Sequence, residues 1–542
     1  MQRPLGAQIS HMLKDRGVSH VFGIPGVHNQ ELYRGIEEAG LTHILARHEQ
    51  GAGFMADGYA RATGNPGVCY VITGPGLTNI MTPMGQAYSD SVPMLVISSC
   101  LDETAATRGQ LHQMKDQRAA AGCVADWSEE ARTAEAAYAL IDRALGEFAV
   151  KRKRPKHIQV PIAVLEGRAE AFTPWHGDLP KDRRFHITRL PLPVKPATPK
   201  DVVNLLALRL SQAERPLFVF GGGAARIGGA QGPVPSLLAK CRAASLCTFA
   251  GRGAVPPGTP LHLGASLARP GSAALFDASD CVVVVGTELA EVDLWRQVSG
   301  LRPGATYINI DPEVLAAAHP KDWTLQYDAL DALVRLEQAL THPPKSGWSE
   351  DLIAGYRDRF RAEVDAERPG ILPVIDALRE SLPEGTMIYS DMTQFAYAAL
   401  EVWDMDRPGH WHHPSGFGTL GYALPAAIGG AVARPGKPTM AIAGDYGFQY
   451  TLQELATAVE LGLSLPIILW DNDGLGEIAD SMTAAQIAPN AVTARNPDFL
   501  KLAEAYGARA AQPATLADLP AALAEAFAAP VPTLIRLRPG LT

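Results

Sequence analysis

The sequence predicts an α/β protein made of three doubly wound parallel-sheet domains. A chain of 542 residues is too long for a single hydrophobic core, and its length suggests about three domains. Short apolar runs alternate with stretches of helical spacing, which is the pattern of βαβ units. Several of these runs end in glycine, as strands do where a parallel sheet approaches a ligand.

Composition argues against several classes of partner. The net charge of −9 speaks against a general nucleic-acid binder. The six cysteines show no CxxC pairing, which predicts reduced thiols in a cytoplasmic protein. The N-terminus lacks an apolar signal core and no run of about 18 apolar residues occurs, so we expect no membrane partner.

Polar residues follow two apolar runs near the C-terminus. Asp445 comes after the predicted strand 440–443, and Asn472 after the predicted strand 467–470, with a predicted helix at 452–461 between them. The carboxyl ends of parallel strands open onto one crevice, where ligands bind. Two such oxygens beside the carbonyl of Gly474 suit Mg²⁺, which completes its shell with phosphate and water. These residues therefore predict a metal-bridged diphosphate.

The stretch GDYGF, closed by Asn472, resembles the diphosphate motif of the thiamine diphosphate enzymes. The resemblance implies that Mg²⁺ is held by Asp445, Asn472 and the carbonyl of Gly474. It also implies cofactor contacts at three positions of the motif itself, Gly444, Tyr446 and Gly447. Two residues depart from the family pattern, because Tyr446 replaces the usual glycine and Asp471 stands where asparagine is frequent.

The first domain, 1–170, is predicted to bind the pyrimidine ring. We expect a helix at 6–16, a strand at 20–22, a helix at 29–39, a strand at 43–45 and a long helix from Glu49. The run RHEQGAGFMADGYAR is similar to the family's glutamate-helix motif. It implies that Glu49, shielded from water, hydrogen-bonds N1′ of the cofactor's aminopyrimidine ring, so that the 4′-imino group can deprotonate C2. The alternative is an acidic residue that serves only the helix dipole.

Two further segments of this domain resemble cofactor and substrate loops. A strand at 68–72 precedes TGPGLTN, where Gly74 and Asn79 are expected beside the pyrimidine ring; Pro25, in the turn after the first strand, is expected to contact the cofactor. A strand at 94–98 leads to His112 and Gln113, where pyruvate decarboxylases have His-His and acetolactate synthases Phe-Gln. The expected proton carriers are His28 and His112, because histidine titrates near neutral pH. The alternative for His112 is a solvated loop residue.

Linkers at 171–196 and 341–352 are predicted to flank a central Rossmann-like domain at 197–340. The basic run 151–156 is predicted to be a solvated face rather than a nucleic-acid signal. In the central domain we expect a helix at 199–212 and strands at 216–220, 281–285 and 306–311. Acetolactate synthases hold FAD in this domain, but loop 263–271 lacks their Met-His-Gly sequence, so we expect no FAD.

The third domain, 353–542, is predicted to bind the diphosphate. Its first strand, 387–390, leads to Thr393 and Gln394, which the resemblance places at the diphosphate. The start of a helix suits this role, because its free backbone N–H groups bind anions. The segment GTLG resembles the family's Gly-Thr-Met-Gly. It implies that Gly418 offers its carbonyl to the 4′-amino group and that Leu420 wedges between the two rings.

The resemblance implies a thiamine diphosphate- and Mg²⁺-dependent decarboxylase that converts a 2-oxo acid to an aldehyde through C2 ylid and enamine intermediates. Several motifs look most like the 5-guanidino-2-oxopentanoate (2-ketoarginine) decarboxylases. A guanidinium-bearing substrate needs a carboxylate, and the expected pocket residues are Glu477, Ile478 and Asp480. The alternative for the two acidic residues is a solvated helix N-terminus. Residues 479–481, Ala-Asp-Ser, depart from the 2-ketoarginine decarboxylases, which are expected to have Lys-Arg-Tyr there. Two alternatives stay open: an acetolactate synthase-like carboligase, and a non-catalytic cofactor-binding homologue suggested by Tyr446.

The positions of the motifs also predict an oligomer. Glu49 lies in the first domain and Asp445 in the third, so the resemblance implies a site shared by two subunits. We expect a homodimer as the smallest unit and a homotetramer as the assembly.

Overall fold

The computed structural model describes residues 2–102, 109–172, 198–225, 228–295, 303–341, 347–493 and 495–542. Most of the predicted linker 171–196, and part of the linker 341–352, lie outside the described residues. The chain divides into two compact units. One consists of the N-terminal part with Leu424–Gly436 and Thr451–Leu463, and the other holds the remainder. The predicted domain boundaries stay predictions.

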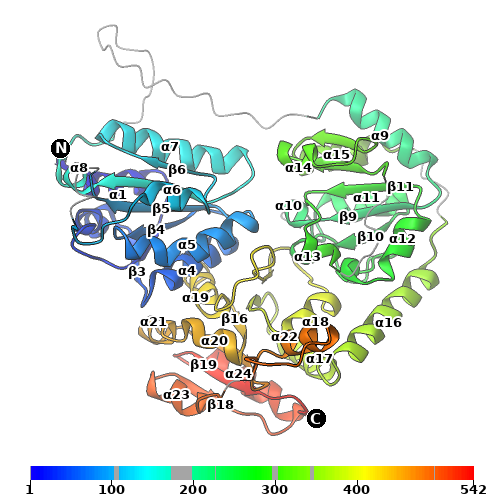
Figure 1. Cartoon of the computed structure of the whole chain (residues 1–542). Coiled ribbons are helices and arrows are strands. Elements are labelled where there is room, and N and C mark those ends of the chain that lie inside the picture. Colours follow the sequence, from blue (N-terminus) through cyan, green and yellow to red (C-terminus); the bar gives the residue numbers. More distant parts are fainter. Residues whose placement is uncertain are drawn as a thin grey trace. The chain divides into compact units, whose positions relative to one another are not determined.

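The first unit contains a six-stranded, fully parallel sheet. Its strand order is β3 (Thr42–Leu45), β2 (His20–Gly23), β4 (Gly67–Val71), β5 (Met94–Cys100), β7 (Lys156–Pro161), β6 (Trp127–Glu130). Its helices are α1 (Leu5–Asp15), α2 (Gln30–Arg34), α3 (Ile36–Ala39), α4 (Glu49–Thr63), α5 (Pro75–Ser89), α6 (Gln117–Gly122), α7 (Ala134–Val150) and α8 (Ile162–Glu166). Helix α7 covers one face of the sheet, and α4 and α5 cover the other (Figure 1). Strands β1 (Arg3–Pro4) and β8 (Arg168–Ala169) form a separate antiparallel pair.

Two expectations for this unit were wrong. The single helix predicted at 29–39 is two short helices that meet at Gly35, a residue with poor helix propensity. The basic run 151–156 is not wholly solvated, because Lys156 is fully buried. The Lys156 ammonium forms ion pairs with Asp126 and Glu147 at 2.6 and 3.0 Å, as a buried charge requires.

Helices α19 (Ala423–Ala433) and α21 (Glu454–Glu460) belong almost wholly to the first unit, although they come from the C-terminal part of the chain. Helix α4 packs closely on α19. A Cβ at Gly58 would lie 2.0 Å from the carbonyl oxygen of Ala426, and one at Gly429 would lie 1.9 Å from that of Met55. These glycines therefore let the two backbones approach each other.

The second unit contains two parallel sheets. The central one has the order β10 (Ala244–Cys247), β9 (Pro216–Phe220), β11 (Cys281–Val285), β12 (Thr306–Asn309), β13 (Trp323–Gln326). Its other elements are α9 (Lys200–Gln212), α10 (Gly222–Ala225), α11 (Pro233–Cys241), η2 (Phe249–Gly251), η3 (Ser266–Ala268), α12 (Ser272–Ala278), α13 (Glu291–Leu294), α14 (Pro312–Ala316) and α15 (Ala329–Ala339).

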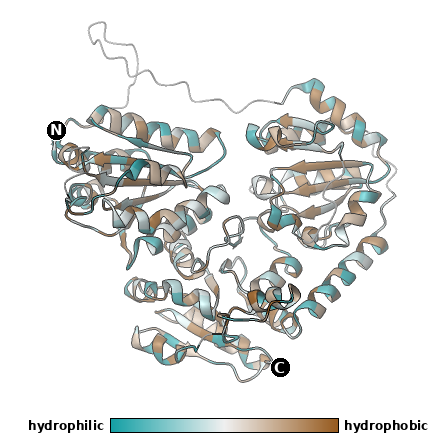
Figure 2. Ribbon diagram, in the orientation of Figure 1, coloured by the Kyte–Doolittle hydropathy of each residue, from teal (hydrophilic) through white to brown (hydrophobic). Residues whose placement is uncertain are grey.

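The last sheet has the order β15 (Trp411–His412), β14 (Met387–Ser390), β16 (Thr439–Gly444), β17 (Pro466–Trp470), β19 (Thr533–Leu537), β18 (Arg509–Ala511). The associated helices are α16 (Glu350–Glu367), α17 (Leu372–Ser381), α18 (Gln394–Val402), α20 (Asp445–Thr451), α22 (Gly476–Ala484), α23 (Phe499–Ala505), η4 (Leu516–Asp518) and α24 (Leu519–Ala528). The central strands of the sheets are mostly hydrophobic and appear brown in Figure 2, whereas an edge strand such as β6 carries Ser128, Glu129 and Glu130. Three parallel α/β sheets confirm the predicted fold class.

The first and last sheets share one topology. Counted along the chain within each sheet, both have the strand order 2-1-3-4-6-5. In both, the order reverses between the first and third strands, which are β2 and β4 in one sheet and β14 and β16 in the other. Ligands of open parallel sheets bind at such reversals, outside the carboxyl ends of the strands. The fold thus marks two loop regions as candidate binding edges.

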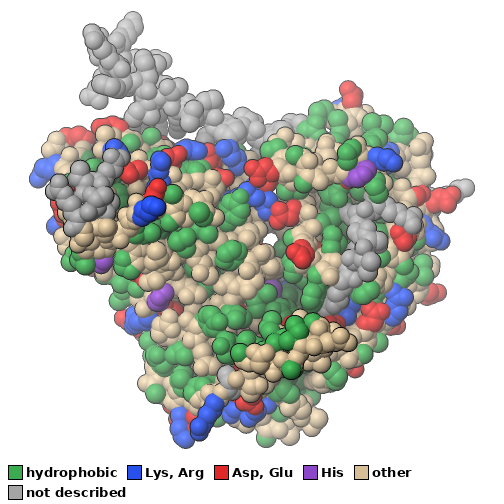
Figure 3. Space-filling model, in the orientation of Figure 1, with side chains coloured by type: hydrophobic (Ala, Val, Ile, Leu, Met, Phe, Trp, Pro, Cys, Tyr) green, Lys and Arg blue, Asp and Glu red, His purple; other side chains and the backbone are tan. Residues whose placement is uncertain are grey.

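The surface charges, the cysteines and the apolar helices can be described directly from the structure. Acidic and basic side chains are interspersed over the face drawn in Figure 3. All six cysteines are free thiols, and five of them are buried. Among the described residues, no helix is both long and apolar enough to span a bilayer.

Candidate functional site

The strand ends of the last sheet bring three oxygens together. Asp445 is the first residue of α20, directly after β16, and Asn472 follows β17. The side-chain oxygen of Asn472 lies 3.2 Å from Asp445 Oδ1 and 2.9 Å from the carbonyl oxygen of Gly474. Three acceptors this close are favourable only with a cation among them, unless the amide turns its NH₂ toward the other two oxygens.

These spacings fit a small divalent cation. Adjacent oxygens of an octahedral Mg²⁺, each roughly 2.1 Å from the ion, lie about 3 Å apart. In the described part of the chain, no group of three His, Cys, Asp or Glu side chains could hold a metal. The set therefore combines one carboxylate with an amide and a carbonyl, which leaves positions for phosphate and water.

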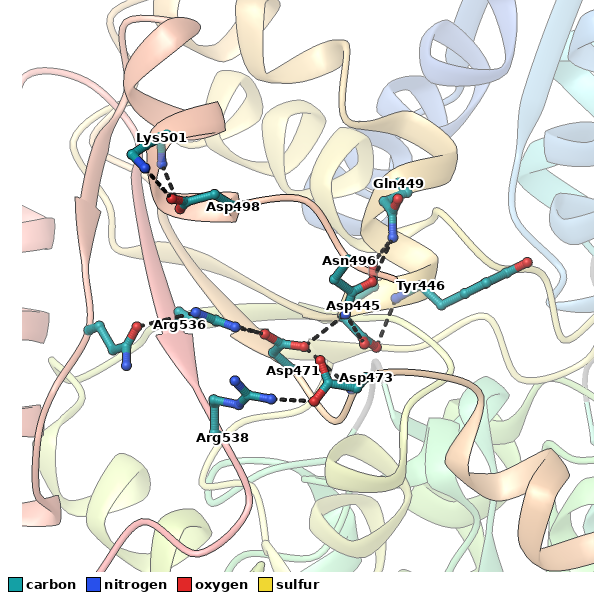
Figure 4. Close-up of polar contacts among 11 residues, drawn as sticks. Asp445, Tyr446, Gln449, Asp471, Asp473, Asn496, Asp498, Lys501, Arg536 and Arg538 are labelled. Carbon is teal, nitrogen blue, oxygen red and sulfur yellow. Dashed lines mark hydrogen bonds and ion pairs between the residues drawn. The ribbon is translucent and has the colours of Figure 1, made fainter. Parts of the chain in front are cut away.

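Asp445 lies in a network of polar side chains (Figure 4). Its Oδ1 accepts from the backbone N–H of Tyr446 at 2.9 Å, and its Oδ2 accepts from Asn496 Nδ2 at 2.6 Å. Burial raises the pKa of the Asp445 carboxyl, and the neighbouring charge of Asp471 adds to the rise. Asp471, which departs from the family pattern, accepts from Arg536 Nε on β19 at 2.6 Å, so its charge has a partner.

Tyr446 does not crowd the loop. It lies in the first turn of α20 and is absent from the non-glycine residues of positive φ, so its backbone needs no glycine. Its side chain extends away from Asp445 and Asn496 (Figure 4). The ring centroid lies 6.0 Å from that of Tyr450, one helical turn later.

The loop after β14 is held by Asp391, a residue that sequence reasoning missed as a site residue. Its carboxylate is buried and accepts from the backbone N–H of Met392 at 2.9 Å and of Gly421 at 2.8 Å. A Cβ at Gly447 would lie 3.0 Å from Asp391 Oδ2. Asp391 therefore joins three segments that hold predicted cofactor contacts, namely Thr393–Gln394, Gly418–Leu420 and Gly444–Gly447.

The residues predicted for the substrate pocket lie on α22. Glu477 accepts from Arg368 Nη2 at 2.8 Å, and Asp480 accepts from Gln394 Nε2 at 2.7 Å. Ile478 is 51% exposed. Gln394 Oε1 also accepts from Asn472 Nδ2 at 3.3 Å, so Gln394 connects the oxygen cluster to α22.

In the first unit, Glu49 begins α4, and its side chain is buried. Asn79, in α5, donates from Nδ2 to Glu49 Oε2 at 2.9 Å. The sequence predicted both residues for the pyrimidine side of the site, and the fold brings them into contact.

A second buried carboxylate supports the start of α4. Glu454, on α21, accepts from the backbone N–H groups of Arg47 and His48 at 3.0–3.1 Å and from Thr457 Oγ1 at 2.9 Å. Burial raises the pKa of the Glu454 carboxyl. Glu454 thus fixes the backbone immediately before Glu49. The sequence signal for Glu454 is weak, because the buried residues of its short helix include the polar Thr457 as well as Leu455 and Ala458.

The two predicted histidines lie side by side. The ring centroids of His28 and His112 are 4.8 Å apart at an interplanar angle of 71°. Their Nδ1 atoms are buried and have no hydrogen-bond partner among the described residues. Burial, followed by the charge of His112, lowers the pKa of His28.

The loop of His112 is closely fitted to the glycine turn after β4. His112 has a φ of +63°, in the left-handed region. Gly74 has a φ of +70°, and a Cβ there would lie 2.5 Å from the His112 carbonyl oxygen. Gln113 accepts from the backbone N–H of Gly109 at 2.6 Å, and Pro25 lies exposed in the turn after β2. These predicted residues all lie at the carboxyl edge of the first sheet.

Family models match three segments of the chain. Residues 3–120 match the N-terminal TPP binding domain of thiamine pyrophosphate enzymes, residues 203–336 the central domain, and residues 391–537 the C-terminal TPP binding domain. The two candidate edges fall in the first and third of these segments.

The chain is also similar to curated proteins over most of its length. It is 40% identical to a probable 2-ketoarginine decarboxylase of Pseudomonas aeruginosa, over 98% of this chain and 93% of that protein. It is 30% identical to the large subunit of acetolactate synthase isozyme 2 of Escherichia coli, over 93% of this chain and 89% of that protein. It is 27% identical to the large subunit of acetolactate synthase isozyme 1 of Escherichia coli, over 99% of this chain and 94% of that protein.

Asp391 predicts a pH dependence of stability. Burial raises its pKa from 3.8 to about 6, so the folded protein binds this proton more tightly than the unfolded chain. The resulting stabilisation is complete below pH 3.8 and is lost as the pH rises through about 6, a change of about 3 kcal/mol. Asp391→Asn should lack this loss. Unfolding midpoints of wild type, Asp391→Asn and the exposed control Asp406→Asn between pH 4 and 7 test this; parallel profiles for all three would contradict it.

Proposed function

This chain belongs to the family of thiamine pyrophosphate-dependent enzymes, and from that premise we propose that it decarboxylates a 2-oxo acid to an aldehyde, with Mg²⁺ as its metal. The observation that carries the proposal is the oxygen cluster of Asp445, Asn472 and Gly474, with the spacing of Mg²⁺ ligands. The relative named a 2-ketoarginine decarboxylase supports decarboxylation, because it aligns along almost the whole chain.

Bound thiamine diphosphate supplies the carbon centre that takes up the electron pair when a 2-oxo acid loses carbon dioxide. In our proposal Asp445, Asn472 and the Gly474 carbonyl would hold the Mg²⁺ ion that neutralises the charge of the diphosphate. Glu49, buried and held by Asn79, shares a proton with the aminopyrimidine ring. The remaining proposed cofactor contacts are Pro25, Gly74, Thr393, Gln394, Gly418, Leu420, Gly444, Tyr446 and Gly447.

His28 and His112 are the proposed proton carriers, with Gln113 beside them at the substrate. The lowered pKa of His28 keeps its ring neutral near pH 7, so the ring can accept a proton. One ring nitrogen of each histidine, Nδ1, is buried and lacks a protein partner among the described residues, so these nitrogens are the ones whose protonation the protein does not fix. The contact between the rings lets one imidazole influence the charge of the other.

Replacement of Glu49 tests the mechanism. Glu49→Gln should lower turnover by roughly 10²–10⁴-fold, the usual contribution of a positioned proton donor, and leave thiamine diphosphate binding within a few-fold of wild type. Carbon dioxide and aldehyde are scored on cationic, aromatic, branched and short 2-oxo acids, and binding is measured calorimetrically. The exposed Glu37→Gln is the matched control. Unchanged turnover of Glu49→Gln would refute the role.

The proposed substrate is a cationic 2-oxo acid such as 5-guanidino-2-oxopentanoate, and the contacts favour Asp480 over Glu477 as its partner. Glu477 already pairs with the buried guanidinium of Arg368. Asp480 is exposed and is bound by the neutral amide of Gln394, so its charge is uncompensated by that contact. A substrate guanidinium would therefore find a free charge at Asp480.

Asp480→Asn should raise KM for 5-guanidino-2-oxopentanoate by about 10-fold or more, the usual effect of losing a charge-assisted hydrogen bond, while an uncharged 2-oxo acid of similar length is barely affected. Glu477→Gln should not change the preference between the two acids. Steady-state kinetics on both acids measure this. An equal loss on both acids in Asp480→Asn would exclude the residue as the specificity determinant.

A carboligase that joins two 2-oxo acids is the second candidate, favoured by the similarity to acetolactate synthases. Formation of acetolactate or acetoin in the same assays would support it. We propose no flavin requirement, which the visible spectrum of the purified protein checks. If no 2-oxo acid of the panel reacts, a non-catalytic homologue becomes the better account.

We also propose a cytoplasmic homodimer or homotetramer in which Glu49 of one subunit and Asp445 of another serve the same cofactor. Coexpression of inactive Glu49→Gln with inactive Asp445→Asn should then restore activity, on the order of a quarter of wild type for random pairing. Only a mixed pair contains one site with both residues intact. Activity no higher than the sum of the separate variants would contradict the shared site, and the mass in solution distinguishes dimer from tetramer.

A further inference from the structure

The metal cluster has a neighbour outside the predicted ligand set. Asn496 lies after α22, where the chain returns to the cluster, and its amide donates to two carboxylates (Figure 4). Nδ2 lies 2.6 Å from Asp445 Oδ2 and 2.9 Å from Asp471 Oδ1. We propose that Asn496 is a positioning residue that holds Asp445 in its metal-binding orientation. This inference rests on the proposed metal site.

The orientation of the Asn496 amide is determined by its partners. Its oxygen accepts from Gln449 Nε2 at 3.2 Å, and the same Nε2 donates to the Asp445 carbonyl at 3.1 Å. Turning the amide would place its oxygen against two carboxylates and its NH₂ against an NH₂. The amide therefore has one favourable orientation.

With the Asn496 amide in that orientation, the two carboxylate oxygens of Asp445 have different partners. Oδ2 is held by Asn496, whereas Oδ1 accepts from the Tyr446 N–H and faces the oxygens of Asn472 and Gly474. With Oδ2 fixed, rotation of the carboxylate is restricted, and Oδ1 stays directed at the cation position. Fixing a metal ligand through its second oxygen is a common way to set metal affinity.

The charges around Asn496 explain why a neutral donor suits the position. Asp445 and Asp471 are both buried, and Arg536 compensates Asp471. A lysine or arginine at 496 would neutralise Asp445 and repel a cation. An apolar residue would leave two buried carboxylates facing each other without the N–H groups they require. The amide satisfies both and preserves the charge of Asp445 for the metal.

The test measures metal binding rather than turnover. Metal-free full-length protein is saturated with thiamine diphosphate and titrated with Mg²⁺ in a calorimeter, and the unfolding midpoint without metal checks that each variant is folded. Asn496→Ala should bind Mg²⁺ roughly 10–100-fold more weakly than wild type, the usual effect of removing a residue that orients a metal ligand. Asn490→Ala is the matched control, because Asn490 is exposed and bonds only the nearby Ala488 carbonyl.

Gln449→Ala provides a second, milder variant. It removes the bond that orients the Asn496 amide but leaves the amide in place, so Mg²⁺ binding should weaken a few-fold, less than in Asn496→Ala. If Asn496→Ala does not fold, this graded loss decides the question. Mg²⁺ affinity equal to wild type in folded Asn496→Ala, or in Gln449→Ala when only that variant folds, would overturn the inference. Failure of wild type to bind Mg²⁺ with thiamine diphosphate would instead refute the proposed function.

Discussion

The constraint on which this structure depends is the burial of carboxylates at strand and helix ends. A charged carboxylate away from water is costly unless N–H donors or a cation satisfy it. Asp391 and Glu454 each accept from backbone N–H groups, Glu49 from an amide, and Asp471 from a guanidinium. Asp445 differs, because each of its oxygens accepts from one N–H donor, but Oδ1 also lies close to the side-chain oxygen of Asn472, which in turn lies close to the carbonyl oxygen of Gly474. A cation is the natural remaining partner.

The shared strand order of the first and last sheets explains where these carboxylates lie. In both sheets the order reverses between the first and third strands, and loops on the two sides of the reversal diverge to leave room for a ligand. The last sheet places acidic and amide oxygens at this edge. The first sheet places Gly74, the two histidines and, at its neighbouring strand, the start of the Glu49 helix. The same strand order therefore presents metal-binding oxygens at the edge of one sheet, and glycine, histidine and Glu49 at the edge of the other.

Much of the fold could be predicted because its strands are short apolar runs that end in glycine or a polar residue. The central strands β4, β9, β11 and β17 were found within about a residue, since burial on both faces leaves a continuous apolar signal. Edge strands such as β15 and β18 were missed, because β15 has only two residues and β18 has three partly exposed ones, so neither forms a continuous apolar run. The contacts of Lys156 were missed because charge in a sequence indicates exposure until its partners are known.

The candidate site was predictable to a similar extent and for similar reasons. Asp445, Asn472 and Glu49 stand within dense local motifs, so the sequence indicated them. Glu454, Asp391 and Asn496 act through contacts with segments distant in the chain, and no local pattern reports such contacts. Tyr446, which replaces the usual glycine of the diphosphate motif, is accommodated because its side chain points away from Asp445 and Asn496 (Figure 4).

Calorimetric titration of thiamine diphosphate into wild type and Asp445→Asn, each with Mg²⁺ and with a chelator, tests whether Asp445 and a metal ion together hold the diphosphate. We expect tight binding only for wild type with Mg²⁺. We expect a loss of at least about 10-fold in Asp445→Asn or on chelation, because the diphosphate then lacks its metal bridge. Equal affinity in all four titrations would contradict this role of Asp445 and the metal ion.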